Sequence, residues 1–96
     1  MKIKKIQKYQ NCGNQNCFFS IFFENEITKK EILALAQNDS LILSEDFPEP
    51  FFKIISNEYI IRGTIGLSRI NVEFYSYQKD VCEILQNNLI EKITKN

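Results

Sequence analysis

Three segments in the second half of the chain, residues 51–55, 58–65 and 70–75, are rich in β-branched and aromatic residues and are separated by short turns at 56–57 and 66–69. In the last segment every second residue is apolar, which is the period of a strand with one buried face. Strands joined by such short turns pair antiparallel, because a parallel pair needs a crossover of about a dozen or more residues. The sequence therefore predicts three strands of an antiparallel sheet.

The first quarter of the chain carries two further β-type segments. Residues 2–9 alternate lysines imperfectly with Ile3, Ile6 and Tyr9, a pattern typical of an edge strand that is protected by charge. Residues 17–23 contain four of the eight phenylalanines and follow a run of turn-forming residues. We expect these two segments to form a β-hairpin or two consecutive strands.

A helix is predicted to follow these strands. Thr28 and Glu31 have the spacing of a capping box, in which each side chain accepts a hydrogen bond from an otherwise unpaired backbone N–H group. Ile27 and Ile32 have the spacing of a hydrophobic staple across the same helix start. We therefore expect a helix of about three turns that begins at Thr28 and ends near residues 38–39.

The end of the chain predicts a second helix. Ser76 can cap a helix that runs to about Lys95. Its apolar residues fall on one stripe at helical spacing, namely Val81, Leu85, Leu89 and Ile93, with Cys82 and Ile84 beside them. An apolar stripe of this length needs a surface to cover, so we expect the helix to pack on the predicted sheet.

Residues 41–43 predict a short strand between the first helix and the later strands, whereas residues 44–50 must be irregular because they contain two prolines. The predicted order is ββα(β)βββα, in which the bracketed strand is residues 41–43. We expect a single α+β domain over residues 1–96. Its architecture is a two-layer sandwich, with an antiparallel sheet of about four to five strands and two helices on one face.

Composition excludes several classes of function. Twelve basic residues balance twelve acidic residues, so no global field draws the chain to nucleic acid or to an anionic membrane. The absence of histidine excludes His-based acid–base chemistry and His-containing zinc sites. No apolar run approaches the roughly 18 residues that span a bilayer. We therefore expect a non-enzymatic protein that has no cofactor and does not contact a membrane.

The three cysteines and the lack of a secretory signal near Met1 predict a cytoplasmic protein. Cys12 and Cys17 could bind a soft metal or form a redox pair. A structural zinc site without histidine would also need a carboxylate, a water or a second subunit as a ligand. The alternative that we favour is that Cys17 and Cys82 pack as small apolar residues.

Both arginines of the chain lie near one turn, together with two hydroxyl groups. The candidate anion-binding residues are Arg62, Thr64, Ser68 and Arg69. Guanidinium groups, hydroxyls and turn amides can together hold a phosphate or a carboxylate. The alternative is a β-bulge at Gly63 and a tight turn at Gly66, with both arginines solvated.

The segment from Asp39 to Phe52 carries several acids and two prolines. The candidate partner-binding residues are Glu45, Asp46, Phe47 and Glu49. Prolines lower the entropy cost of ordering a loop, and Phe47 supplies an apolar anchor for a partner that has a basic surface. The alternative is that the Phe47 ring packs into the core.

The amino-terminal lysines form a local basic patch. The candidate nucleic-acid-binding residues are Lys2, Lys4, Lys5 and Lys8. A basic strand with an aromatic residue nearby can contact a nucleic acid strand. The alternative that we favour is that these lysines prevent edge-to-edge aggregation of the sheet.

These features predict a small protein-interaction module that has a protein partner, with a homodimer as the alternative assembly. The acidic loop suits an inhibitor of a host nucleic-acid enzyme, because an acidic patch can occupy a basic groove. The abundance of Ile, Asn and Lys indicates an AT-rich coding genome, such as that of a phage or a low-GC prokaryote. The other candidate functions are a metal- or anion-binding accessory protein and nucleic-acid binding through the lysines, of which we expect the last least.

Overall fold

The structure, a computed structural model, describes residues 2–9, 17–37, 39–46, 48–75 and 79–95. These residues form strands and helices in the predicted order ββα(β)βββα. The elements are β1 (Ile3–Tyr9), β2 (Cys17–Phe23), α1 (Lys29–Ala36), β3 (Ser40–Ser44), β4 (Phe51–Ile55), β5 (Tyr59–Thr64), β6 (Arg69–Phe74) and α2 (Lys79–Lys95).

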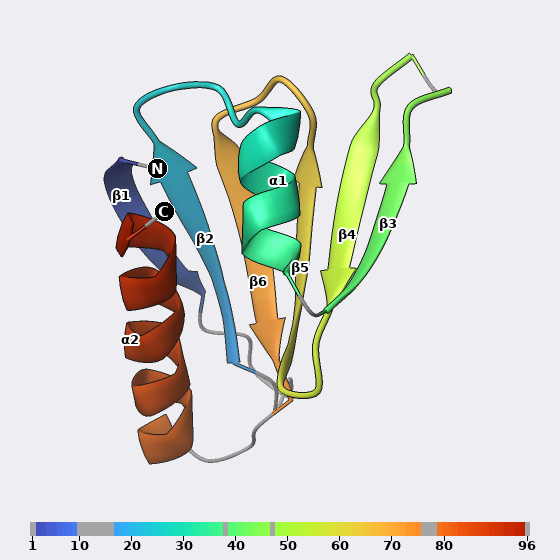
Figure 1. Cartoon of the computed structure of the whole chain (residues 1–96). Coiled ribbons are helices and arrows are strands. Elements are labelled where there is room, and N and C mark those ends of the chain that lie inside the picture. The colour runs from blue at the N-terminus through green and yellow to red at the C-terminus, as the bar shows by residue number, and fades with distance from the viewer. Residues whose placement is uncertain (1, 10–16, 38, 47, 76–78, 96) are drawn as a thin grey trace.

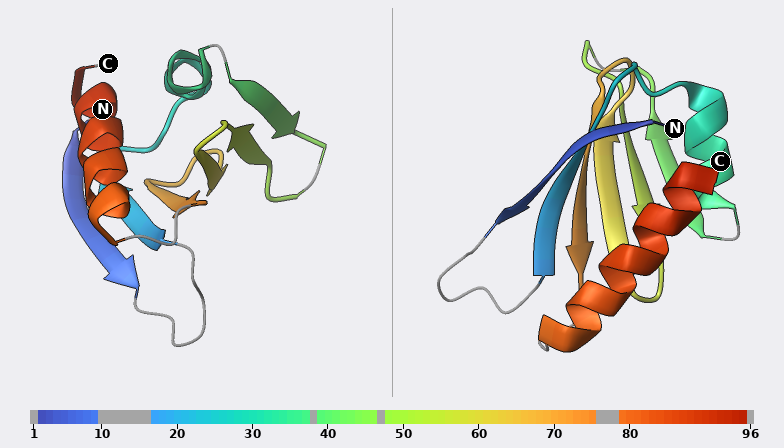
Figure 2. Two further views of the ribbon diagram at one scale, coloured as in Figure 1. Left: turned by 90° about the horizontal axis from the view of Figure 1, so that it is seen from below. Right: turned by 90° about the vertical axis from the view of Figure 1, so that its left-hand side faces the viewer.

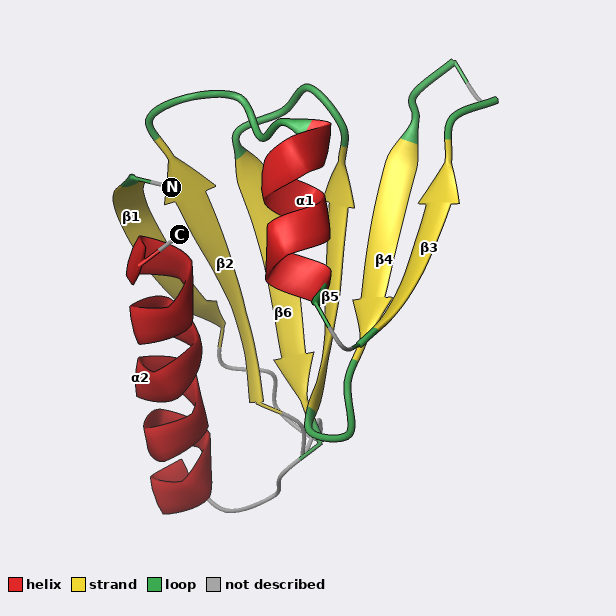
Figure 3. Cartoon of the chain, viewed as in Figure 1, coloured by secondary structure: helices red, strands yellow, loops and turns green. Residues whose placement is uncertain are grey.

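One sheet contains six strands in the order β1-β2-β6-β5-β4-β3, and each neighbouring pair is antiparallel (Figure 1, Figure 3). The predicted α+β class is confirmed, but the predicted count of four to five strands is wrong. Both edge segments join the sheet, β1 beside β2 and β3 beside β4. The short β3 is held because Leu41 and Leu43 pack against the core while its backbone pairs with β4.

Both helices lie on the same face of the sheet, as the views along and across it show (Figure 2). The predicted capping box is present at the start of α1. Thr28 Oγ1 accepts a hydrogen bond from the Glu31 backbone N–H at 3.2 Å, and Glu31 Oε1 accepts one from the Thr28 backbone N–H at 3.0 Å. The helix ends at Ala36, close to the predicted stop. Within the described segments, neither helix combines the length and the apolarity needed to cross a bilayer.

The buried side of α2 differs in part from the predicted stripe. Its buried residues are Cys82, Gln86, Leu89 and Ile93, whereas Val81 and Ile84 are exposed. Leu89 and Ile93 have helical spacing both with Val81 and Leu85 and with Cys82 and Gln86. Periodicity alone therefore does not show which of the two series is buried. Gln86 is buried, and Leu85 of the predicted stripe is partly buried against the core. Ser76, the predicted cap, lies outside the described residues.

The core lies between the sheet and the two helices. Phe19 of β2, Phe52 of β4 and Phe74 of β6 are at most 1% exposed. Phe74 stacks on Phe19 with ring centroids 5.7 Å apart, and the Tyr59 ring meets Phe74 edge to face at 5.6 Å. The four inner strands therefore supply the aromatic centre of the core.

Glycine has a different role at each of two positions around the β5–β6 turn. Gly63 pairs regularly with Phe52 and with Ile70, so the β-bulge expected there is absent. A Cβ atom at residue 63 would lie 2.6 Å from the Phe52 ring, so this position accepts the ring only because it is glycine. Gly66 has a φ of 92°, which confirms the predicted tight turn.

Candidate functional site

No described helix covers the second face of the sheet, which we term the helix-free face (Figure 2). Strand alternation and register place on it the side chains of Lys5, Gln7, Phe18, Ser20, Phe22, Ser40, Ile42, Ser44, Phe51, Lys53, Ile55, Ile60, Arg62, Thr64, Arg69, Asn71 and Glu73. Four of these side chains are cations and one is an acid. The helix-free face is therefore locally basic, which the neutral net charge of the chain conceals.

A row of polar side chains crosses the helix-free face. Lys53 lies opposite Arg62, and Arg62 lies opposite Asn71. Asn71 lies opposite Ser20, which in turn lies opposite Gln7. Residues that are directly opposite on neighbouring strands have Cβ atoms about 4.5–5.5 Å apart, so their side chains interact. The row therefore forms one connected polar strip from β4 to β1.

The end of this row that includes Lys53, Arg62 and Asn71 borders a surface depression of about 390 Å³. The depression is lined by Phe51, Phe52, Lys53, Arg62, Gly63, Thr64 and Asn71. Its volume lies within the range of small-molecule pockets, about 300–1,000 Å³. The lining combines two cations, a hydroxyl, an amide, two phenylalanines and a glycine. Cationic and polar donors of this kind can hold and orient an anion.

The two cations of the depression face each other across β4 and β5. Like charges directly opposite each other destabilise a strand pair, so Lys53 and Arg62 repel each other. Arg62 Nη1 lies 3.4 Å from Glu73 Oε1, an ion pair that compensates one of the two charges. Within the part of the chain that the structure describes, Lys53 forms no ion pair. The depression therefore holds an excess of positive charge.

Arg69 lies on the same face but is engaged with other residues. Its Nε donates to Asn71 Oδ1 at 3.2 Å, and its Nη2 donates to Ser20 Oγ at 3.3 Å. Ser20 Oγ donates to Asn71 Oδ1 at 2.6 Å. The Arg69 guanidinium and the Lys5 ammonium lie 5.2 Å and 5.6 Å from the centre of the Phe22 ring. These contacts fix Asn71 beside the depression and hold Arg69 away from it.

The structure brings only part of the predicted anion site together. Arg62 and Thr64 line the depression, whereas Arg69 belongs to the neighbouring network. Ser68 lies in the β5–β6 turn, where its carbonyl oxygen accepts a hydrogen bond from the Phe23 N–H at 2.7 Å. The predicted four-residue cluster is therefore divided between three places.

Sequence reasoning missed Lys53, Asn71 and Phe51 as lining residues. Alternation within residues 51–55 does carry a signal, because Lys53 stands between two apolar residues and so belongs to the opposite face. This alternation assigns Lys53 to one face of the sheet, but it does not show which residues of the adjacent strands lie beside Lys53. The neighbours depend on the register of β4 against β5, which is not a local property of either strand.

The predicted partner-binding residues lie in the connection between β3 and β4. Glu45, Asp46 and Glu49 are exposed, and Phe47 lies outside the described residues. Glu45 Oε1 lies 2.8 Å from Lys29 Nζ of α1. An exposed ion pair contributes only about 0–1 kcal/mol, so Glu45 can exchange this partner for another. Partner binding by this segment stays a prediction.

The four amino-terminal lysines lie at or next to an edge strand, as expected, since β1 is the first strand of the sheet. Lys2 pairs with Glu24 at 3.4 Å, and Lys5 lies over the Phe22 ring. Lys4 and Lys8 are exposed. The lysines are thus spread along the edge, and nucleic-acid binding by them stays a prediction.

Cys12 and the side chain of Cys17, which form the predicted metal site, lie outside the described residues. Cys82 is buried on α2, as expected of a small apolar residue. Among the residues that the structure does describe, no group of three or more Cys, Asp or Glu side chains could hold a metal ion. Metal binding therefore rests on the sequence pattern alone.

Tyr59 carries a perturbed ionisable group on the helix-covered face. Its hydroxyl donates to Asp39 Oδ2 at 3.4 Å. Burial, followed by the negative charge of Asp39, raises the pKa of Tyr59 to about 12 from an ordinary value of 10.0. Both causes favour the neutral phenol, so this group stays protonated at neutral pH and acts as a structural donor.

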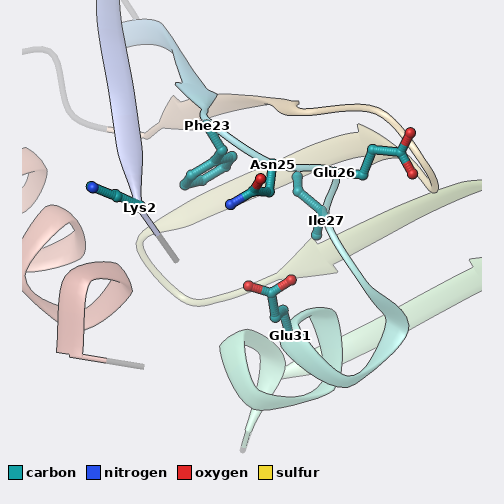
Figure 4. A pocket seen from close by; sticks show the side chains of 6 residues that line it. All are labelled: Lys2, Phe23, Asn25, Glu26, Ile27 and Glu31. Atoms are coloured by element: carbon teal, nitrogen blue, oxygen red, sulfur yellow. The ribbon is translucent and has the colours of Figure 1, made fainter.

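A smaller cavity of about 100 Å³ lies between the start of β1 and the start of α1 (Figure 4). It is lined by Lys2, Phe23, Asn25, Glu26, Ile27 and Glu31. The Glu31 carboxylate points toward this cavity, but it already accepts hydrogen bonds from the backbone and the hydroxyl group of Thr28. The cavity therefore belongs to the cap of α1.

Comparison of the chain with protein-family models, with curated proteins and with solved structures found no match. The class that the fold defines is a small α+β protein with one antiparallel sheet, of which the described helices cover a single face.

Proposed function

We propose that the protein is a binding module that holds an anionic ligand with a planar ring in the depression of the helix-free face. Lys53 and Arg62 contact the anionic group. Thr64 and Asn71 add hydrogen bonds, and the Phe51 ring stacks on the planar part of the ligand. A phosphate attached to a planar base has this chemistry, so the proposed ligand is a nucleotide.

The opposition of Lys53 and Arg62 is the observation that carries the proposal. A pair of like charges across two strands weakens the sheet, and natural proteins break such local rules mainly where function requires it. An anion between the two cations replaces their repulsion with charge-assisted hydrogen bonds. Each hydrogen bond to a charged group contributes about 1.5–3 kcal/mol.

The aromatic side of the depression supports a ligand that has a ring. Phe51 is 39% exposed and lies on β4 two residues from Lys53. Stacking of a base on an aromatic side chain contributes about 1–3 kcal/mol. A free nucleotide and a nucleotide of a single strand present the same phosphate and base to the site, so the proposal covers both sources.

The test is titration calorimetry with AMP, inorganic phosphate and a short single-stranded oligonucleotide. The substitutions Lys53→Gln and Arg62→Gln should each weaken AMP binding by about tenfold or more, because each removes a charged donor. Lys30→Gln is the matched control, since Lys30 is exposed on α1, away from the depression. It should bind AMP as tightly as the unmodified chain does.

The three ligands separate the alternatives. Oligonucleotide binding that is tighter than AMP binding and falls steeply with salt identifies a single strand as the source. Equal binding of phosphate and AMP would show that the ring is not recognised. The proposal is wrong if neither AMP nor the oligonucleotide binds, or if the two glutamine variants bind AMP as the control does.

A second candidate function is protein binding through the β3–β4 connection. Asp46 and Glu49 are exposed where this hairpin projects from the sheet (Figure 1), and neither has an ion pair with another described residue. An acidic loop is complementary to a basic groove, as on a nucleic-acid enzyme that the protein would inhibit. Replacing both residues with their amides should weaken capture of a partner from host lysate without lowering the melting temperature. Unchanged capture would reject this candidate.

A further inference from the structure

The two edges of the sheet differ in charge. β1, at one edge, carries Lys4, Lys5 and Lys8, and its pairing with β2 has a register shift near its start. β3, at the other edge, contains two serines, two leucines and an isoleucine and has no charged residue. An edge strand presents unpaired N–H and C=O groups to other chains, and proteins usually protect it with lysines, bulges, prolines or a short length. β1 has lysines and a register shift, whereas β3 has only its short length of five residues.

The edge at β3 is also open. β3 pairs with β4 on one side, and no described element lies beyond it on the other side (Figure 1, Figure 2). Ile42, in the middle of β3, is 45% exposed on the helix-free face. Leu41 and Leu43 are partly buried against the core on the opposite face. An open, apolar and uncharged edge strand is suited to pairing with another strand.

The sequence of β3 identifies the partner strand. It reads Ser-Leu-Ile-Leu-Ser, a palindrome that is centred on Ile42. We propose that β3 pairs antiparallel with β3 of a second copy of this chain, about a two-fold axis at Ile42. Ile42 then lies opposite its own copy, and Leu41 lies opposite Leu43 of the second copy. Residues that are directly opposite point to the same face, so the leucines meet on one face and the isoleucines on the other.

Acidic residues flank β3 on both sides. Asp39 and Glu45 lie just outside the strand. In the two-fold register, Asp39 of each copy lies opposite Glu45 of the other copy. Within its own chain Asp39 accepts a hydrogen bond from Tyr59, and Glu45 contacts Lys29 at 2.8 Å, which reduces the repulsion between the acids. A shift by two residues would place Glu45 opposite Leu41, a carboxylate against an apolar side chain. The palindrome therefore sets the register, and the acids restrict the pairing to the five residues of β3.

Pairing of this kind is isologous and closes at a dimer. The two six-stranded sheets become one continuous sheet, with the helices of both copies on the same face. The depressions of both copies then lie on the helix-free face, and their β4 strands are about 14 Å apart, three strand spacings. The dimer follows from the edge alone and does not depend on the proposed ligand.

The test is sedimentation velocity over a range of protein concentrations without ligand, applied to the unmodified chain and to two variants. Ile42→Glu places a carboxylate opposite Lys53 within its own chain, which supports the fold, but places two carboxylates against each other in the dimer. Ile84→Glu is the matched control, because Ile84 is 60% exposed on α2. We expect the unmodified chain and Ile84→Glu to form dimers as concentration rises and Ile42→Glu to stay monomeric.

Two further measurements test whether β3 is the strand that forms the dimer. Mixing Ile42→Glu with Ile42→Lys should restore a mixed dimer, because the introduced charges then attract each other. Amide hydrogen exchange of the unmodified chain needs no substitution, and it should slow on β3 but not on β1 as concentration rises. The proposal is wrong if the unmodified chain stays monomeric, if Ile84→Glu abolishes the dimer, if Ile42→Glu still forms a dimer or if exchange slows at β1 in place of β3.

Discussion

The two faces of the sheet are built from alternate residues of the same strands, yet they have opposite characters. The helix-covered face presents side chains such as Phe74, Ile61 and Phe19, which are completely buried. The helix-free face presents Lys53 and Arg62 beside a depression. Neighbouring residues in one strand therefore have different surroundings, buried on one side of the sheet and more exposed on the other. Substitutions one residue apart should separate stability from ligand binding.

The largest expected effect compares one phenylalanine from each face. Phe74→Ala removes a fully buried ring that contacts Phe19 and Tyr59, and it should lower the free energy of unfolding by about 3–5 kcal/mol. Phe51→Ala makes the same chemical change at an exposed ring, and it should lower that free energy by about 1 kcal/mol or less. Urea denaturation measures both values. Equal losses would show that the two faces contribute alike to stability.

The next effect tests the close packing of Gly63 against the Phe52 ring. Gly63→Ala would place a Cβ atom 2.6 Å from the Phe52 ring, so the ring must move, and unfolding should become easier by about 1–3 kcal/mol. Thermal or urea denaturation measures this loss. In a chain that also carries Phe52→Leu, the same glycine substitution should cost less, because the ring is absent. A cost that is unchanged in the second background would contradict the steric explanation.

The pKa of Tyr59 tests how strongly the helix-covered face excludes water from the phenol. Its pKa of about 12 in the folded chain lies above the ordinary value of 10.0, so the neutral phenol stabilises the fold. This contribution is complete below about pH 10 and is lost as pH rises from about 10 to 12, because the unfolded chain releases the proton first. Ultraviolet titration of the phenol, with Tyr59→Phe to identify its signal, measures the pKa. Asp39→Asn should lower it only in part, since burial is the larger cause, and a titration near pH 10 would contradict the structure.

The smallest expected effect is a gain in stability on the helix-free face. Lys53→Gln removes the repulsion with Arg62 and should raise the free energy of unfolding by roughly 0.5 kcal/mol, although we expect it to weaken binding of the proposed ligand. The gain should shrink at high salt, which screens exposed charges. Lys30→Gln on α1 should leave stability unchanged. A loss of stability in Lys53→Gln would show that the two cations do not repel each other in the folded chain.

Local signals were sufficient for the elements of this fold. The Thr28–Glu31 capping box marks the start of α1 because its hydrogen bonds lie within four residues of each other. Alternation in residues 70–75 identifies β6 and its buried face in the same way. The edge strand β3 was harder to recognise, because five residues hold little pattern and much of its support comes from pairing with β4.

The candidate site could not be predicted in the same way, because it depends on register. A turn at residues 56–57, as the sequence predicts, would have placed Lys53 opposite Ile60. In the structure the Ser56 N–H donates to the Tyr59 carbonyl oxygen at 2.9 Å, so the turn lies one residue later, Ile55 pairs with Ile60, and Lys53 lies opposite Arg62. Moving a turn by one residue changes every cross-strand pair while leaving each side chain on its own face. The sequence thus indicated the two arginines but not their neighbours.

The sequence by itself determined which segments become helices and strands, their order along the chain and the face to which most strand residues point. These properties depend on hydrogen bonds and on burial patterns within a few residues. Only the tertiary structure decided the order β1-β2-β6-β5-β4-β3, the side of α2 that is buried and the pairing of Lys53 with Arg62. Those choices depend on contacts between residues far apart in the chain, whose free energies compete across the whole fold and leave no local pattern in the sequence.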